Sequence, residues 1–333
     1  MSWLRLTVVT TCGIFILGLA YFYYLLSPTM ITAGEESFII NAGAGLKEIV
    51  SLLDGLGFIR SPAAFKIYSL LSGSAHKLKP GEYQLAASLS TPQLVRRLIQ
   101  GPPDQEILII EGESLKDIDK KLTSSGLIEA GSLASFSPPL LAGDFPFLQG
   151  VGNLEGFLFP DTYRIAPRSS VEEILKKLLA NFENKALPQL RVSGDDWYET
   201  LIIASLIERE IPKEEDREFV AGILSKRLEL GMPLQVDASV VYAKCRGSFT
   251  DCPPLTRDDF RVKSLYNTYF YPGLPPSPIA NPGLGAVSAA QSPRASDFLY
   301  YLSDPKTGKT VFAETFEEHN INRARYLPRT FSR

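Results

Sequence analysis

The chain has 333 residues, 45% of them hydrophobic and 21% charged, and a net charge of −3. This composition is typical of a folded protein of about two domains and excludes a disordered chain. The balance of charge and the lack of a basic stripe give no reason to expect nucleic acid as a partner. Two distant histidines and three cysteines show no metal-ligand spacing, so we expect neither a metal nor a cofactor.

Residues 6–26 form an uncharged apolar run of 21 residues, which is long enough to cross a bilayer. Arg5 precedes this run, whereas Glu35 and Glu36 follow it, and this asymmetry favours a cytoplasmic N-terminus. The sequence therefore predicts a membrane anchor over residues 1–27, with everything after it outside the cytoplasm. A cleaved signal peptide is the alternative.

Residues 45–59 (GLKEIVSLLDGLGFI) and residues 114–128 (SLKDIDKKLTSSGLI) share one pattern at a constant offset of 69. Each copy predicts a short amphipathic helix that ends at a glycine. The flanking runs FIINAG and EILIIEGE predict strands before these helices. A glycan-binding module and a plain packing scaffold both fit this repeat.

Residues 137–163 are rich in proline, glycine and aromatic residues, which is typical of a linker or the wall of a cleft. Glu155 and Asp161 lie in this stretch among aromatic rings. Aromatic faces beside carboxylates suit a sugar, because rings stack on its C–H faces and carboxylates accept from its hydroxyls. A packed turn capped by Asp161 is the alternative.

Residues 197–211 predict a helix that is apolar nearly all round and therefore buried. Asp196 and Glu199 predict a capping box at its start, and Pro212 predicts its end. Two further helices are expected, one starting at the Ser170 capping box and one over residues 213–230.

Glu208 and Glu210 lie in the last turn of the central helix. Two positions on a helix differ by about 200°, so the two side chains face opposite ways. Glu210 emerges from an apolar face at the negative end of the helix dipole, which predicts a raised pKa. A carboxyl that keeps its proton near neutral pH suits a general acid. The alternative is a buried glutamate that pairs with Arg217 or Arg227.

Residues 233–236 predict an extended segment with Gln235 and Asp237 on one face. Asp237 is also a candidate cap for a helix starting at Ala238. Cys245 and Cys252 bracket a short loop, and outside the cytoplasm such a pair predicts a disulfide.

The stretch from Tyr266 to residue 282 combines aromatic rings with five prolines. Prolines stiffen an exposed loop and lower the entropy lost when a ligand binds. Tyr266 and Tyr269 supply rings, and Asn267 and Thr268 supply hydrogen-bonding groups. A short helix and a hairpin that turns at residues 304–308 complete the chain.

The runs ASLIERE, DREFVAGILSKRL, GMPLQVDASVVYA and YNTYFYPGLPPSPIANPG together resemble the YceG-like family of endolytic murein transglycosylases. The likeness extends from the N-terminal run to the end of the chain. Three positions depart from the family pattern. Ala238 stands where proline is usual, Lys226 where asparagine is usual, and Thr310 where histidine is usual.

The resemblance implies that Glu210 is the catalytic residue and that an α+β fold carries it. It also implies a LysM-like module with the internal repeat over residues 28–136 and a catalytic domain over residues 137–333. Some of the residues discussed above become candidate contacts to the substrate under this resemblance. They are Glu155, Asp161, Gln235, Asp237, Tyr266, Asn267, Thr268 and Tyr269.

The implied reaction cleaves the β-1,4 bond between N-acetylmuramic acid and N-acetylglucosamine within peptidoglycan strands and leaves 1,6-anhydro ends. The implied role is to trim or terminate nascent strands at the inner membrane, with cell-wall synthesis proteins as candidate partners. A hydrolase with two carboxylates, Glu210 with Glu155, Asp161 or Asp237, is one alternative. A non-catalytic anchor that binds the wall is the other.

Overall fold

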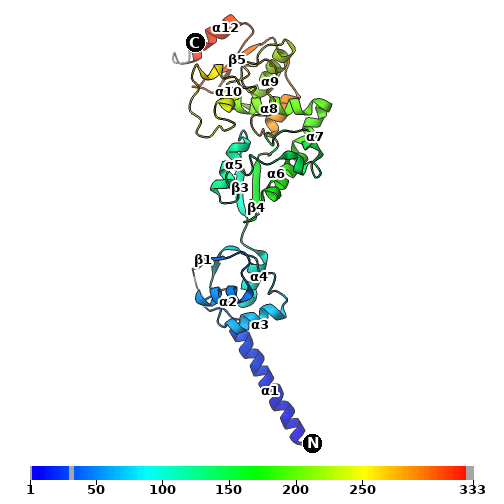
Figure 1. The fold of residues 1–333 in the computed structure, drawn as a ribbon, viewed down its shortest axis with the longest axis vertical. Coiled ribbons are helices and arrows are strands. Elements are labelled where there is room, and N and C mark those ends of the chain that lie inside the picture. Colours follow the sequence, from blue (N-terminus) through cyan, green and yellow to red (C-terminus); the bar gives the residue numbers. More distant parts are fainter. Residues whose placement is uncertain (1, 30–33, 328–333) are drawn as a thin grey trace. The chain divides into compact units, whose positions relative to one another are not determined.

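The computed structural model describes residues 2–29 and 34–327, which form a mixed helix-and-sheet fold (Figure 1). This content agrees with the α+β prediction. The chain divides into two compact units. The first contains residues 1–105 with 166–168, and the second contains residues 106–165 with 169–333.

The first unit consists of a long helix, a small β–α–α–β arrangement and one more helix. Strands β1 and β2 pair antiparallel, with Glu35 opposite Ala86. The ring of Phe38 lies 5.0 Å from that of Phe58 and 5.6 Å from that of Tyr83, so one aromatic cluster fills the core. The elements are α1 (Ser2–Leu25), β1 (Glu35–Ile40), α2 (Leu46–Gly55), α3 (Pro62–Leu71), β2 (Gly81–Ala86) and α4 (Thr91–Gln100).

Helix α1 is the one helix of the described residues that is long and apolar enough to cross a membrane, over Thr7–Leu25. None of that segment is buried against the rest of the chain. Its length and composition suit a membrane span or a signal sequence, as the sequence indicated.

The second unit surrounds helix α8, which packs against α9, α10 and α11. Strands β3 and β4 form one two-stranded sheet, and β5 and β6 form an antiparallel hairpin that turns at residues 304–308, as predicted. The strands and α-helices are β3 (Gln105–Ile109), α5 (Leu115–Ser124), β4 (Asp161–Ile165), α6 (Val171–Lys185), α7 (Leu187–Leu190), α8 (Trp197–Glu210), α9 (Glu214–Glu229), α10 (Asp237–Lys244), α11 (Leu284–Gln291), β5 (Tyr300–Ser303), β6 (Thr310–Ala313) and α12 (Phe316–Tyr326).

Helix α8 is buried over most of its length, which confirms the prediction from its apolar sequence. Its predicted capping box is wrong. Asp196 occupies the N-cap, but its side chain makes no capping hydrogen bond, because its backbone (φ −85°, ψ 13°) is not extended as a capping residue requires. The capping box of Ser170 and Glu173 at the start of α6 does form.

Asn281 joins three distant segments of the second unit. Its backbone N–H and its side-chain amide both donate to the carbonyl of Glu113, at 2.9 and 2.8 Å. Its Oδ1 accepts from the N–H of Leu158 at 2.8 Å. Because Asn281 is fully buried, these bonds fix the β3–α5 loop and residue 158 against the proline-rich loop.

The two copies of the internal repeat become α2 and α5. Both helices end as predicted, at the positive-φ glycines Gly57 (φ 74°) and Gly126 (φ 70°). The copies fall into different compact units, which divide at residue 105 within the predicted 28–136 module. The domain boundaries and the LysM-like character of this region therefore stay predictions.

Candidate active site

Glu210 lies at the junction of two helices. It is the last residue of α8, and Ile211 before Pro212 leaves the helical conformation (φ −119°, ψ 98°). Its Oε1 accepts from the N–H of Ala238, in the first turn of α10, at 2.8 Å. The half-buried carboxyl therefore lies between the negative end of α8 and the positive end of α10.

The surroundings of Glu210 favour its protonated form. Burial, followed by the negative charge of Asp237, raises its pKa from 4.5 to about 7. The N–H of Ala238 and the guanidinium of Arg209 oppose this rise. A carboxyl with this pKa holds its proton in a substantial fraction of molecules at neutral pH and gives it up readily, as a general acid and base must.

Glu208 faces the other side of α8 and is held by two partners. Its Oε1 pairs with Arg217 at 2.7 Å and its Oε2 accepts from the N–H of Gly283 at 2.9 Å, while its side chain is only 5% exposed. Burial raises its pKa, and Gly283 and Arg217 oppose the rise. Of the two arginines considered above as partners for a buried glutamate, Arg217 is the one that pairs, and it pairs with Glu208. Arg227 donates instead to backbone carbonyls, among them that of Leu234 at 2.7 Å.

The segment after α9 is held beside Glu210 by one threonine. The hydroxyl of Thr268 accepts from the N–H of Val236 at 3.0 Å and bonds the hydroxyl of Ser239 at 2.8 Å. The carbonyl of Thr268 accepts from the N–H of Gln235 at 3.1 Å. Gln235 itself is exposed and adopts a left-handed conformation (φ 57°). Thr268 is buried, so it positions the segment that carries Gln235.

Asp237 and Tyr269 lie together next to Glu210. The hydroxyl of Tyr269 donates to Oδ1 of Asp237 at 2.6 Å. Asp237 is the first residue of α10 and is exposed, so it lies inside the helix rather than at the N-cap position that the sequence suggested. Glu210, Asp237 and Tyr269 therefore form one cluster of side chains at the start of α10.

Two residues of the tyrosine-rich loop hold that loop together. The side chain of Asn267 is fully buried, and its amide donates to the carbonyls of Phe260 and Val262 at 3.0 and 2.9 Å. The hydroxyl of Tyr266 bonds that of Ser277 at 2.8 Å. The structure thus engages Asn267 and Tyr266 in internal hydrogen bonds.

Glu155 is enclosed at the start of α5. Its Oε1 accepts from the N–H of Leu115 at 2.8 Å and its Oε2 accepts from the hydroxyl of Tyr242 at 3.0 Å. It is only 1% exposed, and burial raises its pKa to about 8. Both of its carboxyl oxygens accept hydrogen bonds within the protein, so Glu155 is not part of the cluster of Glu210, Asp237 and Tyr269.

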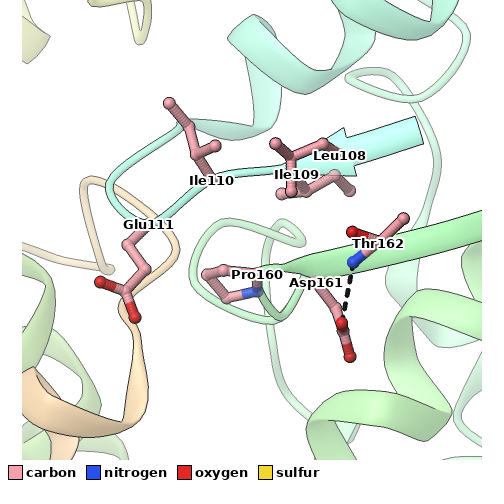
Figure 2. Close-up of a pocket in the computed structure, with 7 residues that line it drawn as sticks. All are labelled: Leu108, Ile109, Ile110, Glu111, Pro160, Asp161 and Thr162. Atoms are coloured by element: carbon pink, nitrogen blue, oxygen red, sulfur yellow. Dashed lines mark hydrogen bonds between the residues drawn. The ribbon is translucent and has the colours of Figure 1, made fainter. Parts of the chain in front are cut away.

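Asp161 lies at the start of β4, beside a cavity of about 500 Å³ (Figure 2). Its Oδ2 accepts from Asn181 at 2.8 Å and pairs with Lys185 at 2.5 Å, which lowers its pKa to about 2. Figure 2 shows Pro160 between Asp161 and the other acid of this cavity, Glu111. The residues lining the cavity are Leu108, Ile109, Ile110, Glu111, Pro160, Asp161 and Thr162, and Glu210 is not among them.

The chain matches known proteins over most of its length. Residues 38–325 match the YceG-like family. The chain belongs to the YceG-like family. It is 29% identical to an endolytic murein transglycosylase of Streptococcus pneumoniae D39 over 92% of its length, and 30% identical to one of Bacillus subtilis 168 over 86%. The chain spans 62% of the pneumococcal relative and 84% of the Bacillus relative.

A solved member of the YceG-like family has a similar fold. The crystal structure of a putative YceG-like protein of Listeria monocytogenes aligns with a TM-score of 0.58 at 29% identity. The alignment covers 87% of this chain and the whole of that one. The fold and the family are therefore supported by independent comparisons.

The sequence did not indicate the contacts around Arg209, which precedes Glu210 in the chain. The guanidinium of Arg209 lies 3.8 Å from the ring of Phe249, in the loop closed by the Cys245–Cys252 disulfide. That disulfide confirms the predicted pair. Asp117 of α5 holds the same loop, because its carboxylate accepts from the hydroxyl of Ser248 at 2.6 Å and from two backbone amides. The pattern Ser-x-x-Asp predicts a capping box, but nothing local indicates this second role.

Tyr301 is another residue that the sequence did not single out. Its hydroxyl is buried and has no hydrogen-bond partner within residues 2–29 and 34–327. Burial and then the charge of Glu210 raise its pKa well above the ordinary value. Across the same described ranges, no cluster of three histidine, cysteine or carboxylate side chains could hold a metal ion.

Proposed function

We propose that the chain is an endolytic lytic transglycosylase of peptidoglycan, with Glu210 as its only acid and base. The observation that carries this proposal is the half-buried Glu210 carboxyl, whose pKa is raised to about 7 beside the exposed Asp237 and the half-buried Tyr269. The YceG-like relatives named endolytic murein transglycosylase support the same reaction.

One carboxyl can serve both halves of a lytic cleavage. Glu210 gives its proton to the glycosidic oxygen of the leaving N-acetylglucosamine as the bond from C1 of N-acetylmuramic acid breaks. The C6 hydroxyl of the same muramic residue then attacks C1, and Glu210 accepts its proton. A 1,6-anhydro end forms, no water is consumed, and Glu210 returns to its protonated form. The intramolecular nucleophile gains the large effective concentration of proximity.

Asp237 and Tyr269 fit supporting roles in this reaction. The charge of Asp237 raises the pKa of Glu210 and suits the positive charge that develops at C1 in the transition state. The hydrogen bond from Tyr269 fixes the orientation of Asp237. Gln235, exposed at the same edge, is a further candidate contact to a sugar hydroxyl.

A two-carboxylate hydrolase is the second candidate, and the position of Asp237 is what favours it. Asp237 adjoins Ala238, whose N–H bonds Glu210, so these two acids are the pair that the structure brings together. Glu155 and Asp161 are instead engaged in hydrogen bonds within the protein. In a hydrolase Asp237 would act as the nucleophile or would activate a water molecule.

Digestion of purified glycan strands in heavy-oxygen water separates the two reactions. The proposal expects new muramic ends that are one water lighter than reducing ends and carry no heavy oxygen. Heavy oxygen at the new ends would show hydrolysis and reject the lytic mechanism. No cleavage by a folded, full-length chain would favour a non-catalytic wall-binding anchor.

We also propose that helix α1 anchors the protein in the inner membrane, with a cytoplasmic N-terminus and the second unit outside. This placement brings Glu210 to newly made strands, which it would trim or terminate near cell-wall synthesis proteins. Protease added to intact spheroplasts should digest the part of the chain after α1. Full protection of that part from the protease would show that the orientation is the opposite one.

A further inference from the structure

Helix α3 of the first unit carries an apolar stripe that nothing in the described chain covers. Ile67, Leu70 and Leu71 are 46%, 63% and 81% exposed, and their spacing places them on one face of the helix. The opposite face packs Phe65 and Ser69 into the core, both at 0% exposure. The packing of α3 into the core therefore does not need the stripe, which leaves apolar side chains exposed.

The end of the apolar helix α1 is fixed to the residue that precedes α3. The guanidinium of Arg60 lies 5.0 Å from the Tyr24 ring of α1, and its Nε donates to the carbonyl of Pro28 at 2.8 Å. Ser61 then caps α3. Figure 1 shows α3 beside the last turn of α1, and both belong to the first unit.

A second contact holds the same junction from the other side. Leu26 is only 7% exposed, and its carbonyl accepts from the N–H of Thr91, the first residue of α4, at 2.9 Å. Hydrogen bonds to Leu26 and Pro28 therefore join the end of α1 to the rest of the first unit. A membrane around α1 would end close to α3, because Tyr24 is the kind of residue that lies at a membrane interface.

We propose that the Ile67–Leu70–Leu71 face of α3 lies in the outer boundary of the bilayer that α1 spans. The proposal rests on the membrane span proposed above. A helix of ten residues is about 15 Å long and can lie flat at the interface with its apolar side inward. Lys66 borders the stripe, about 40° from Leu70 around the helix, and can extend its ammonium to anionic headgroups. The first unit would then be held at a fixed distance from the membrane by two contacts, the span of α1 and the apolar face of α3.

Depth-dependent quenching tests this contact in the full-length chain. The protein carries Cys12→Ser and Leu70→Cys, with a polarity-sensitive fluorophore on residue 70, in phosphatidylcholine–phosphatidylglycerol vesicles. The matched control carries Ile39→Cys in place of Leu70→Cys, with the same fluorophore. Ile39 is 56% exposed on β1 of the same unit. We expect nitroxide lipid to quench the label at residue 70 at least twofold more than the label at residue 39. Equal quenching at both positions would overturn the proposal.

A second measurement separates failure of the contact from failure of the span. Alkaline extraction should leave the labelled chain in the vesicles. If extraction removes it, the proposed span is wrong and the contact falls with it. If the chain stays but residue 70 is quenched no more than residue 39, only the contact is wrong. A blue-shifted label that nitroxide lipid does not quench would indicate a second copy on the stripe and would also overturn the proposal.

The variant Ile67→Ser/Leu70→Ser/Leu71→Ser tests the stripe itself. With the fluorophore at Lys66→Cys, quenching by nitroxide lipid should fall at least twofold relative to the same label on the unmodified stripe. These side chains contribute exposed surface, so the melting temperature of the first unit should change little. Unchanged quenching in a folded variant would contradict the proposal.

Discussion

Helices α2 and α5 are copies of one pattern, and the structure puts them to different uses. Ile49 and Ile118 occupy equivalent positions and are both buried, as are Leu53 and Leu122. Each helix also ends with the same backbone bond, from the N–H of Phe58 to the carbonyl of Leu53 and from that of Leu127 to that of Leu122. The shared positions therefore make core and helix end in both copies.

The positions that differ between the copies carry the contacts to the candidate site. Gly45 caps α2 without a side-chain bond, whereas Ser114 caps α5 in a full capping box. The side chain of Glu48 is exposed and makes no hydrogen bond within the described residues, whereas that of Asp117 holds the disulfide loop beside Arg209. The shared positions thus pack the core in both units, whereas at the equivalent positions 48 and 117 only Asp117 contacts the loop beside Arg209.

The largest effect should come from Glu210, which follows Arg209 in the chain. Glu210→Gln keeps the shape but removes the proton, so turnover should fall by about 10²–10⁴ while the melting temperature stays near that of the parent. The matched change Glu208→Gln should instead lower stability by about 3–5 kcal/mol, because Arg217 loses its buried partner. Both are measured by strand digestion and thermal melting. Full turnover in Glu210→Gln would refute the assignment.

The next effect compares the two equivalent acids directly. Asp117→Ala removes a capping box and three contacts to residues 248–250, which should cost about 3 kcal/mol. Glu48→Ala should change stability by less than about 0.5 kcal/mol. Denaturant unfolding of both variants checks the difference. Equal losses would show that the copies are used alike.

Glu155 makes the stability of the second unit depend on pH. Its pKa is about 8 in the folded protein against 4.5 as the ordinary value, so the folded state binds the proton more tightly. Its stabilising contribution is complete below about pH 4.5 and is lost as pH rises toward about 8. The melting temperature should therefore fall less steeply over this range in Glu155→Gln than in the parent. Parallel curves would contradict the role of Glu155.

Ala238 offers a smaller test of the acid itself. The family pattern that the sequence resembles has proline here, and proline would have no N–H to donate to Glu210, as Ala238 does. The position is in the first turn of α10, where proline is tolerated. Ala238→Pro should raise the pKa of Glu210 and move the alkaline limit of activity upward by about 0.5–1 pH unit. A downward shift would show that the amide does not stabilise the ionised carboxyl.

The smallest effect exchanges the caps of the two copies. Gly45 has an extended backbone (φ −75°, ψ 162°) and open space where a side chain would stand, so Gly45→Ser should stabilise α2 by a few tenths of a kcal/mol. Ser114→Ala should cost about 1 kcal/mol in α5. Chemical denaturation resolves both values. A loss of stability in Gly45→Ser would mean that the N-cap positions of α2 and α5 are not equivalent.

Local patterns predicted what depends on near neighbours in the chain. The apolar run gave the buried helix α8, the short spacing of Cys245 and Cys252 gave the disulfide, and Pro212 marked the end that holds Glu210. The arginine partner of Glu208 could be anticipated because buried carboxylates need one. What could not be predicted depends on contacts between distant segments. The sequence suggested that Thr268 and Asn267 contact a ligand. In the structure Thr268 accepts from the N–H of Val236, and Asn267 donates to the carbonyl of Phe260.

Asn281 has a consequence for how the protein is made. Its bonds to Glu113 and Leu158 close chain loops of more than a hundred residues. Closing such loops is slow, because the entropy must be lost before the contacts are gained. We therefore expect the segment around residues 106–165 to complete its packing during synthesis only after the proline-rich loop has emerged. A stalled or truncated chain that ends before residue 281 would leave apolar surface uncovered and be a ready substrate for chaperones and proteases.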